Sequence, residues 1–542
     1  MKLKKIFIFF FFNAIFLSMA SAGLESLPVQ DGGRIKPYDT FARETLNLLW
    51  GKETYHGRDA TNVVFSWMLI PKDWDNTEFL LIRHSGLREA LNLDNKRLYY
   101  KPADIMVSNR FVLLLQDLKN KRAAREKLDP FFQAVETLEN QVSAFHAVST
   151  GQILRIQPNI AENLAWKNVA DLDVEFRDKF SMITENFVKM ISAKASGDNA
   201  VAKSASKELS IAVDNYKNLA RTKFGEYYND AKISAEVFYN NLHPFRWAWI
   251  FYLAALIFFS IGYFGEKSIW MKFGWATSGV ALFFQIIGVS TRVYILGRAP
   301  VSNMFETVVW VAFGTFVLAS ILYRYTGARV LPVAATMVST LCLILSDISS
   351  SVLDESLTPL EPVLRDNFWL VTHVIIIVSS YAAFFLAFFI GDIVLYYFLR
   401  DEKKYQEQIN SGVNSIYRAL QVGVVLLAVG IIIGGIWADY SWGRFWGWDP
   451  KETWAFIALI GYLIILHGRL VGLLKNFGLA AASVLAFSLV IMAWYGVNFV
   501  LGAGFHTYGF GAGGVEYVAG FVAVHIIFVA YVTTLRRGIS RK

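Results

Sequence analysis

The stretch 437–454, WADYSWGRFWGWDPKETW, holds residue types that could bind a large flat ligand. Five of the chain's sixteen tryptophans fall here, separated by glycines: Trp437, Trp442, Trp446, Trp448 and Trp454. An interfacial aromatic belt, the alternative, accounts for one or two tryptophans at each end of a membrane span. Five in one short polar segment favour a shaped surface on which an extended planar ligand stacks and is buried.

The same stretch contains a predicted helix start. Asp449 suits an N-cap, Pro450 suits the first helical position, and Glu452 stands where the second member of a capping box belongs. We therefore expect a helix to begin at Pro450, with Trp446 and Trp448 held just before its N-terminus.

Histidines on both sides of this stretch indicate what the flat ligand is. The chain has eight histidines, of which His373 precedes the tryptophans and His506 follows them. Two neutral imidazoles can supply opposite axial ligands to a haem iron while aromatic rings contact the porphyrin. A single histidine at the end of a span is more often an interfacial hydrogen-bonding residue, but two that flank this stretch favour ligands.

Two further histidines are predicted to lie at membrane depth. His467 falls about fifteen residues into its span, or about 20 Å from the end at which the span begins. Polar groups at such depth are costly and tend to be functional, so we favour a ligand role for His467. For His525 we favour a hydrogen bond to a neighbouring span.

The elements that must position these residues are apolar helices. Hydrophobic residues make up 55% of the 542 residues, charged residues 18%, and the mean hydropathy is +0.38. These values predict a mainly α, polytopic membrane protein. Nine spans are predicted, at 247–265, 273–295, 304–323, 330–347, 369–398, 416–438, 453–475, 478–497 and 516–535.

The part before the spans is predicted to be exported. Residues 1–22 combine lysines, an apolar core and a small-residue site before Gly23, which is typical of a signal peptide, with an uncleaved anchor as the alternative. Residues 23–245 form the aqueous, mostly helical domain, for which we favour a docking role without chemistry of its own. Residues 246–542 form the membrane domain.

Charge in the connections predicts the orientation. If the first domain is exported, every cytoplasmic connection carries lysine or arginine, as the positive-inside rule requires. Arg292 and Arg298 are the exceptions near an external connection. The tryptophan stretch then lies outside. Because the basic residues follow the spans and form no stripe, the net charge of +8 does not indicate nucleic-acid binding.

The chain's single cysteine, Cys342, lies in an apolar run. One thiol allows no internal disulfide, no CxxC redox pair and no CxxCH haem-attachment site. Covalent haem chemistry must therefore take place on another protein.

The segment WGRFWGWDPKE resembles the tryptophan-rich WWD signature of the haem-handling proteins, which include CcsA/ResC of system II cytochrome c biogenesis and CcmC and CcmF of system I. The resemblance to CcsA covers about 245–542 and includes GRAPVSNMFE at 297–306. PVQDGGRIKPYDTFARE at 28–44 resembles the segment that precedes CcsA in fused CcsBA proteins.

This resemblance implies that haem b is the cargo and that His373 and His506 are its external axial ligands. His467 corresponds to a transmembrane haem ligand whose opposite ligand comes from CcsB. The chain lacks the multi-span CcsB region, so a separate CcsB-like membrane partner is implied. Arg444 or Lys451 could receive the haem propionates.

The resemblance further implies a subunit of a cytochrome c synthase in a bacterial inner membrane. Haem held on the external segment is attached through thioether bonds to CxxCH of an exported apocytochrome c. The alternative is a haem exporter or chaperone of the CcmC type, which delivers haem without ligating it. A solute transporter unrelated to haem is the remaining alternative.

Overall fold

The computed structural model describes residues 23–126, 128–159, 165–225, 228–265, 268–348, 353–359, 367–501 and 514–540. The predicted signal peptide, residues 1–22, and the predicted ligand His506 lie outside the described residues. The chain divides into two compact units, Met1–Leu242 and His243–Lys542, which are called unit 1 and unit 2.

Unit 1 combines helices with four small antiparallel sheets of two strands each within the described residues. Its elements, in chain order, are η1 (Leu24–Ser26), β1 (Pro28–Asp31), β2 (Arg34–Pro37), α2 (Tyr38–Trp50), β3 (Thr54–Tyr55), β4 (Arg58–Asp59), α3 (Ala60–Leu69), α4 (Pro71–Asp75), β5 (Leu80–Leu81), α5 (Ser85–Ala90), β6 (Tyr99–Tyr100), α6 (Pro102–Met106), α7 (Asn109–Ala123), α8 (Pro130–Ser149), β7 (Arg155–Gln157), β8 (Lys167–Asn168), η2 (Val169–Asp171), α9 (Val174–Ala195), α10 (Asn199–Phe224) and α11 (Asp230–Leu242).

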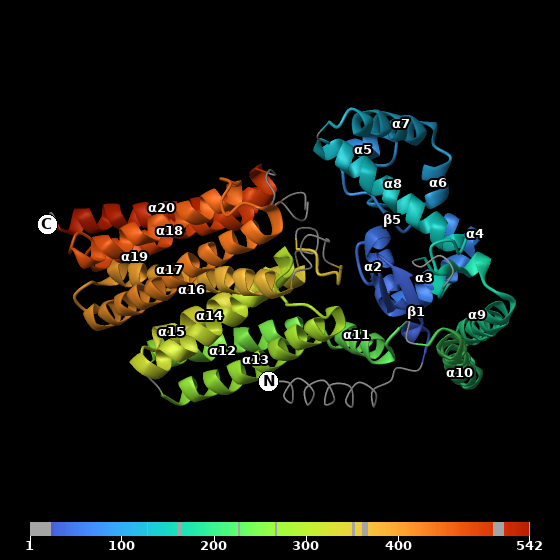
Figure 1. The fold of residues 1–542 in the computed structure, drawn as a ribbon, viewed down its shortest axis with the longest axis horizontal. Helices are drawn as coiled ribbons and strands as arrows, with labels where there is room; N and C mark the ends of the chain where they lie inside the picture. Colours follow the sequence, from blue (N-terminus) through green and yellow to red (C-terminus); the bar gives the residue numbers. More distant parts are fainter. Residues whose placement is uncertain are drawn as a thin grey trace. The chain divides into compact units, whose positions relative to one another are not determined.

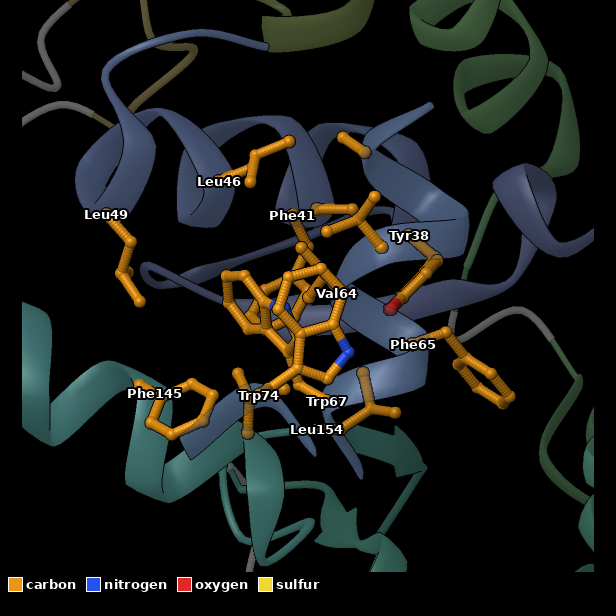
Figure 2. Close-up of a cluster of buried hydrophobic side chains, with 14 of the residues drawn as sticks. Tyr38, Phe41, Leu46, Leu49, Val64, Phe65, Trp67, Trp74, Phe145 and Leu154 are labelled. Atoms are coloured by element: carbon orange, nitrogen blue, oxygen red, sulfur yellow. The ribbon is translucent and has the colours of Figure 1, made fainter. Parts of the chain in front are cut away.

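Aromatic rings from α2, α3 and α8 form the core of unit 1, shown in Figure 2. Trp67 is fully buried and packs edge-on against Phe145 at 5.5 Å and Trp74 at 6.1 Å between ring centroids. Edge-to-face packing of large rings contributes stability beyond the area they bury. A charged network adds to this core, because Arg34 donates two hydrogen bonds of 2.7 and 2.6 Å to the buried carboxylate of Glu236.

Unit 2 consists of long apolar helices that lie alongside one another (Figure 1). They are α12 (Pro244–Phe264), α13 (Ser268–Leu296), α14 (Met304–Thr326), α15 (Val330–Ile348), α16 (Asn367–Arg400), α17 (Gln406–Trp442), α18 (Pro450–Leu470), α19 (Asn476–Ile491), the π-helix η5 (Met492–Leu501) and α20 (Val515–Ser540).

Among the described residues, nine helical segments are long and apolar enough to cross a membrane, in agreement with the nine predicted spans. The mainly α fold is thus confirmed, and the chain is a multi-pass membrane protein.

Several helices begin or end some residues away from the predicted span limits. Helix α17 begins at Gln406, ten residues before the predicted start at 416, because its polar first turns bury Ile409 and Val413 against neighbouring helices. The span predicted to end at 497 also continues further, because η5 extends to Leu501. The length of an apolar run predicts only the part of a helix that crosses the lipid.

Glycines let α16 and α17 pack closely along their length. A Cβ added to Gly423 would lie 2.5 Å from Phe384, and one added to Gly430 would lie 2.6 Å from Ile377. Small residues at helix interfaces bring backbones together, which is a common way for membrane helices to associate.

Arg292 and Arg298, the two exceptions to the charge pattern, are buried around one carboxylate. Arg292 and Arg298 each lie 3.0 Å from Glu306, whose side chain is almost fully covered. Arg292 also donates to the carbonyl of Glu355 and Arg298 to that of Thr358, at 2.9 and 3.0 Å. These arginines therefore act in internal packing, and the positive-inside rule, which concerns exposed connections, does not apply to them.

Candidate functional site

His373 lies in the second turn of α16 and contacts the last turns of α17. Its Nδ1 is 2.8 Å from the carbonyl oxygen of Gly430. Because a carbonyl only accepts hydrogen bonds, Nδ1 carries the proton and Nε2 carries the lone pair. This is the tautomer in which an imidazole ligates a metal through Nε2 while its other nitrogen fixes the ring orientation.

Trp437 lies beside this imidazole in the interior. The His373 and Trp437 rings are nearly parallel, at an interplanar angle of 11° with centroids 6.5 Å apart. Trp437 is 1% exposed and meets Trp442 edge-on at 4.7 Å. Trp437 thus packs beside the imidazole, and Trp442 in turn packs against Trp437.

The glycine pair Gly434-Gly435 makes room for the rings at this end of α17. A Cβ on Gly434 would lie 2.4 Å from Cε1 of His373, and one on Gly435 would lie 2.7 Å from Cζ of Phe445. At both distances the neighbouring ring would have to move to admit a Cβ. The close approach of His373 to α17 therefore depends on Gly434.

The connection between α17 and α18 turns sharply and ends in a capped helix. Gly443 ends α17 with φ +69°, and Trp448 has φ +55°, which is uncommon for a bulky residue. Asp449 then caps α18 in a complete capping box with Glu452, as predicted. Glu452 also accepts a hydrogen bond from the backbone of Gly447 at 2.8 Å. These bonds hold the aromatic residues of the connection in place.

A cavity of about 80 Å³ lies between these elements. Its lining includes His373, Ile377 and Tyr381 of α16, Gly434 and Gly435 of α17, Phe445 and Trp446 of the connection, and Lys451 and Glu452 of α18. Lys451 is the one cation among the described residues that line it. The walls are otherwise mostly aromatic or aliphatic, with one imidazole.

The tryptophans do not form one continuous surface. Trp446 lines the cavity and meets Trp448 edge-on at 5.7 Å, and Trp448 is 68% exposed. Trp437 is buried beside His373, and the half-buried Trp442 contacts Trp437. A flat ligand would therefore meet Trp446, Trp448 and Phe445 directly, whereas Trp437 acts on the histidine.

The other predicted histidines lie elsewhere. His467 is exposed on α18 and does not line the cavity; its Nδ1 lies 2.7 Å from the carbonyl of Leu463. The imidazole of His525 on α20 lies 3.4 Å from the carboxylate of Asp392 on α16, the interaction with a neighbouring span that we favour for it. His506 is outside the described residues, so its pairing with His373 stays a prediction.

Three residues of the site, Ile377, Tyr381 and Gly434, belong to no motif of the sequence. The first two follow His373 at successive four-residue intervals, so one helix face carries all three side chains. That spacing was readable from the sequence. The role of Gly434 was not, because it depends on which helix packs against α17.

Comparisons with known proteins indicate the family of this chain. Residues 300–506 match the model of the family described as cytochrome c assembly protein. The CcsA cytochrome c biogenesis protein of Prochlorococcus marinus is 34% identical over 303 residues, which are 48% of this chain and 92% of that protein. That of Chlorella vulgaris is 33% identical over 283 residues, 46% of this chain and 89% of that protein.

Two other proteins are similar over different extents. Protein NrfI of Wolinella succinogenes is 26% identical over 506 residues, 90% of this chain, so the chain spans about half (54%) of that protein. A solved structure titled cytochrome c haem lyase CcmF shares 13% identity, with a TM-score of 0.36 over 54% of this chain and 50% of its own. From the extent of its identity with the CcsA proteins, the chain belongs to the CcsA family of cytochrome c biogenesis proteins.

Proposed function

We propose that unit 2 binds haem b as cargo at His373 and presents it for covalent attachment to an exported apocytochrome c. The observation that carries this proposal is the hydrogen bond from His373 Nδ1 to Gly430 O, 2.8 Å, beside a cavity walled by Phe445 and Trp446. This hydrogen bond makes Nε2 the ring nitrogen suited to ligate a metal, and the adjoining cavity has the aromatic walls that a porphyrin prefers.

The size of the cavity bears on where haem would lie. An apolar cavity of about 150 Å³ binds a single benzene ring, so a cavity of about 80 Å³ cannot enclose a much larger tetrapyrrole. Haem ligated by His373 would lie at the mouth of the cavity, against the partly exposed Phe445 and Trp446. Lys451 supplies a cation for a propionate. His506 is proposed as the second axial ligand.

The covalent step needs positioning rather than a nucleophilic triad. Each cysteine S–H of CxxCH adds across one haem vinyl C=C, so that sulfur bonds to one carbon and hydrogen to the other. No oxidant or reductant is consumed in that addition. What the chain contributes is a fixed haem orientation, because holding two reactants in place removes most of the entropic cost of their encounter.

A partner on α18 is proposed from the surroundings of His467. Exposed aliphatic residues share the face that carries this histidine: Ile457 (39% exposed), Ile460 (41%), Ile464 (65%) and Val471 (67%). His467 Nδ1 donates to the Leu463 carbonyl at 2.7 Å, so its Nε2 lone pair points away from the backbone of its own helix. This face suits a CcsB-like membrane partner whose own histidine would share a second haem.

The test expresses the full chain with a CcsB-like partner and a CxxCH apocytochrome in a bacterium that lacks its own maturation system. Covalent cytochrome c should form with the wild type and be lost in His373→Ala, with imidazole added to the medium restoring it. Haem bound without covalent product would favour the CcmC-type exporter instead. Wild-type maturation by His373→Ala without imidazole would refute the proposed ligand.

A further inference from the structure

A second, larger cavity lies within the helices of unit 2. Its volume is about 290 Å³, and it is bounded by residues of α14, α15, α16, α19, η5 and α20. Its lining includes the chain's one cysteine, Cys342, and six aromatic residues, among them Tyr381, Phe385 and Phe521. All of these elements belong to candidate membrane spans.

The lining of this cavity carries no charged residue. Among its polar groups, the Thr307 hydroxyl already donates to the carbonyl of Asn303 at 2.8 Å. Apart from the buried Trp494 indole N–H, which has no partner among the described residues, the lining is almost wholly apolar, so polar or charged ligands would lose more hydration than they regain in hydrogen bonds. Haem, which carries two propionates, therefore does not fit here. The part of the occupant that lies inside the cavity is therefore expected to be a hydrocarbon chain.

The cavity opens at the perimeter of the helices. Leu345, near the end of α15, and Tyr517, in the first turn of α20, both line it and are 44% and 84% exposed. The main packing neighbours of helix α20 are α16 and α19. Its Val524 and Ile527 side chains are exposed. At the perimeter of membrane-spanning helices the surrounding medium is lipid, so a lipid chain can enter at this opening.

We propose that this cavity binds one acyl chain of a bilayer lipid. A cavity of about 150 Å³ takes a six-carbon ring, so about 290 Å³ accommodates roughly a dozen carbons, a large part of an acyl chain. Filling it restores the dispersion contacts that an empty space of this size forfeits.

The lipid chain would also contact the floor of the His373 cavity. Tyr381 lines both cavities, with Ile377 on one side of it and Phe385 on the other along the same face of α16. A bound chain would hold the Tyr381 ring in place and so keep the floor beneath the imidazole rigid. This consequence for the haem site rests on the proposed function; the lipid site itself does not.

The test reconstitutes the full chain in nanodiscs with a phosphatidylcholine whose acyl chain carries a diazirine, and maps photo-crosslinks by mass spectrometry. Crosslinks should concentrate in the peptides that contain Cys342–Leu345 and Val518–Phe521. Val311→Phe fills the cavity from α14 and should abolish them. Ile321→Phe, on the same helix but 51% exposed, should leave them unchanged.

Val490→Phe fills the cavity from α19 and guards against a folding defect peculiar to Val311→Phe. Crosslinks spread evenly over all spans, or unchanged in both filled variants, would overturn the proposal. So would suppression of the crosslinks by excess zinc protoporphyrin, which would assign the cavity to cargo. If the wild type instead bound no haem yet gave the expected crosslinks, the proposed function would fail while the lipid site stood.

Discussion

Substitution of Gly434 by alanine tests how His373 is held. The added Cβ would lie 2.4 Å from Cε1 of His373, whereas ordinary contacts begin at 3.4 Å, so the imidazole must retreat from α17 by about 1 Å. Since Gly430 O also belongs to α17, the 2.8 Å hydrogen bond to Nδ1 would be broken.

The energetic cost follows from three terms. Loss of the hydrogen bond costs about 1 kcal/mol and overpacking about 1–3 kcal/mol. Alanine regains about 1 kcal/mol of helix propensity relative to glycine. The net destabilisation is about 1–3 kcal/mol, which the fold should survive. A displacement of 1 Å at a reacting group can lower a rate about 100-fold, so cytochrome c maturation should fall by about that factor.

Two matched variants separate the displacement of His373 from general damage. Gly423→Ala creates the same kind of clash in the same interface, 2.5 Å from Phe384, without contacting His373. Gly279→Ala in α13 meets no atom within 4 Å. All three proteins would be compared by thermal unfolding, haem absorption spectrum and yield of covalent cytochrome c in the reconstituted host.

We expect Gly423→Ala to be destabilised as much as Gly434→Ala but to keep its haem spectrum and most of its activity. Gly279→Ala should match the wild type in all three measurements. If Gly434→Ala kept the wild-type spectrum and yield, the close approach of His373 to α17 would not matter and the reasoning would be refuted. Equal loss in Gly423→Ala would show that helix packing alone explains the defect.

Three further predictions concern single interactions. Glu306→Gln leaves two buried arginines without their carboxylate, and thermal unfolding should show a loss of stability of about 3 kcal/mol. Arg246→Gln, which breaks the more exposed ion pair with Asp347, is the control. A smaller loss of stability in Glu306→Gln than in Arg246→Gln would contradict this prediction. Asp449→Ala removes the α18 cap and should cost about 1 kcal/mol, measured as faster amide hydrogen exchange at the start of that helix; unchanged exchange would argue against the cap. Hydrogen bonds from Lys167 and Gln157 lower the pKa of the Asp173 carboxyl group. Above the ordinary pKa of an aspartate, the charged carboxylate therefore contributes about 0.5 kcal/mol to the free energy of unfolding. This contribution is lost as the pH falls through the lowered pKa. Hydrogen exchange of β7 and α9 in Asp173→Asn should therefore differ from the wild type at neutral pH and converge with it in acid, and a difference that persisted in acid would contradict this.

Local sequence patterns predicted much of the architecture. Runs of apolar residues indicated the spans, because a helix must bury its polar backbone where no water is present. The cap at Asp449 was predictable for a similar reason, since the orphan N–H groups of a helix start are satisfied by residues a few positions away. Interactions between residues a few positions apart can be predicted from the local sequence.

The boundaries and the histidine environments could not be predicted in the same way. The early start of α17 depends on what Ile409 packs against, and the buried state of Arg292 depends on Glu306, which lies on the next helix. Sequence spacing within one helix does not reveal contacts between helices. For that reason the charge rule treated Arg292 as an exposed exception.

By itself, the sequence determined a multi-pass helical protein of the CcsA family with a capped, tryptophan-rich connection. That two imidazoles meet at this connection stays a prediction. Only the tertiary structure decided which structural role each of those residues has. Trp437 became a buried support for His373, Trp446 became a cavity wall, and Gly434 became the residue that admits the imidazole. The physical reason is close packing: which ring is buried and which is exposed depends on the helix that lies opposite, and that helix is distant in sequence.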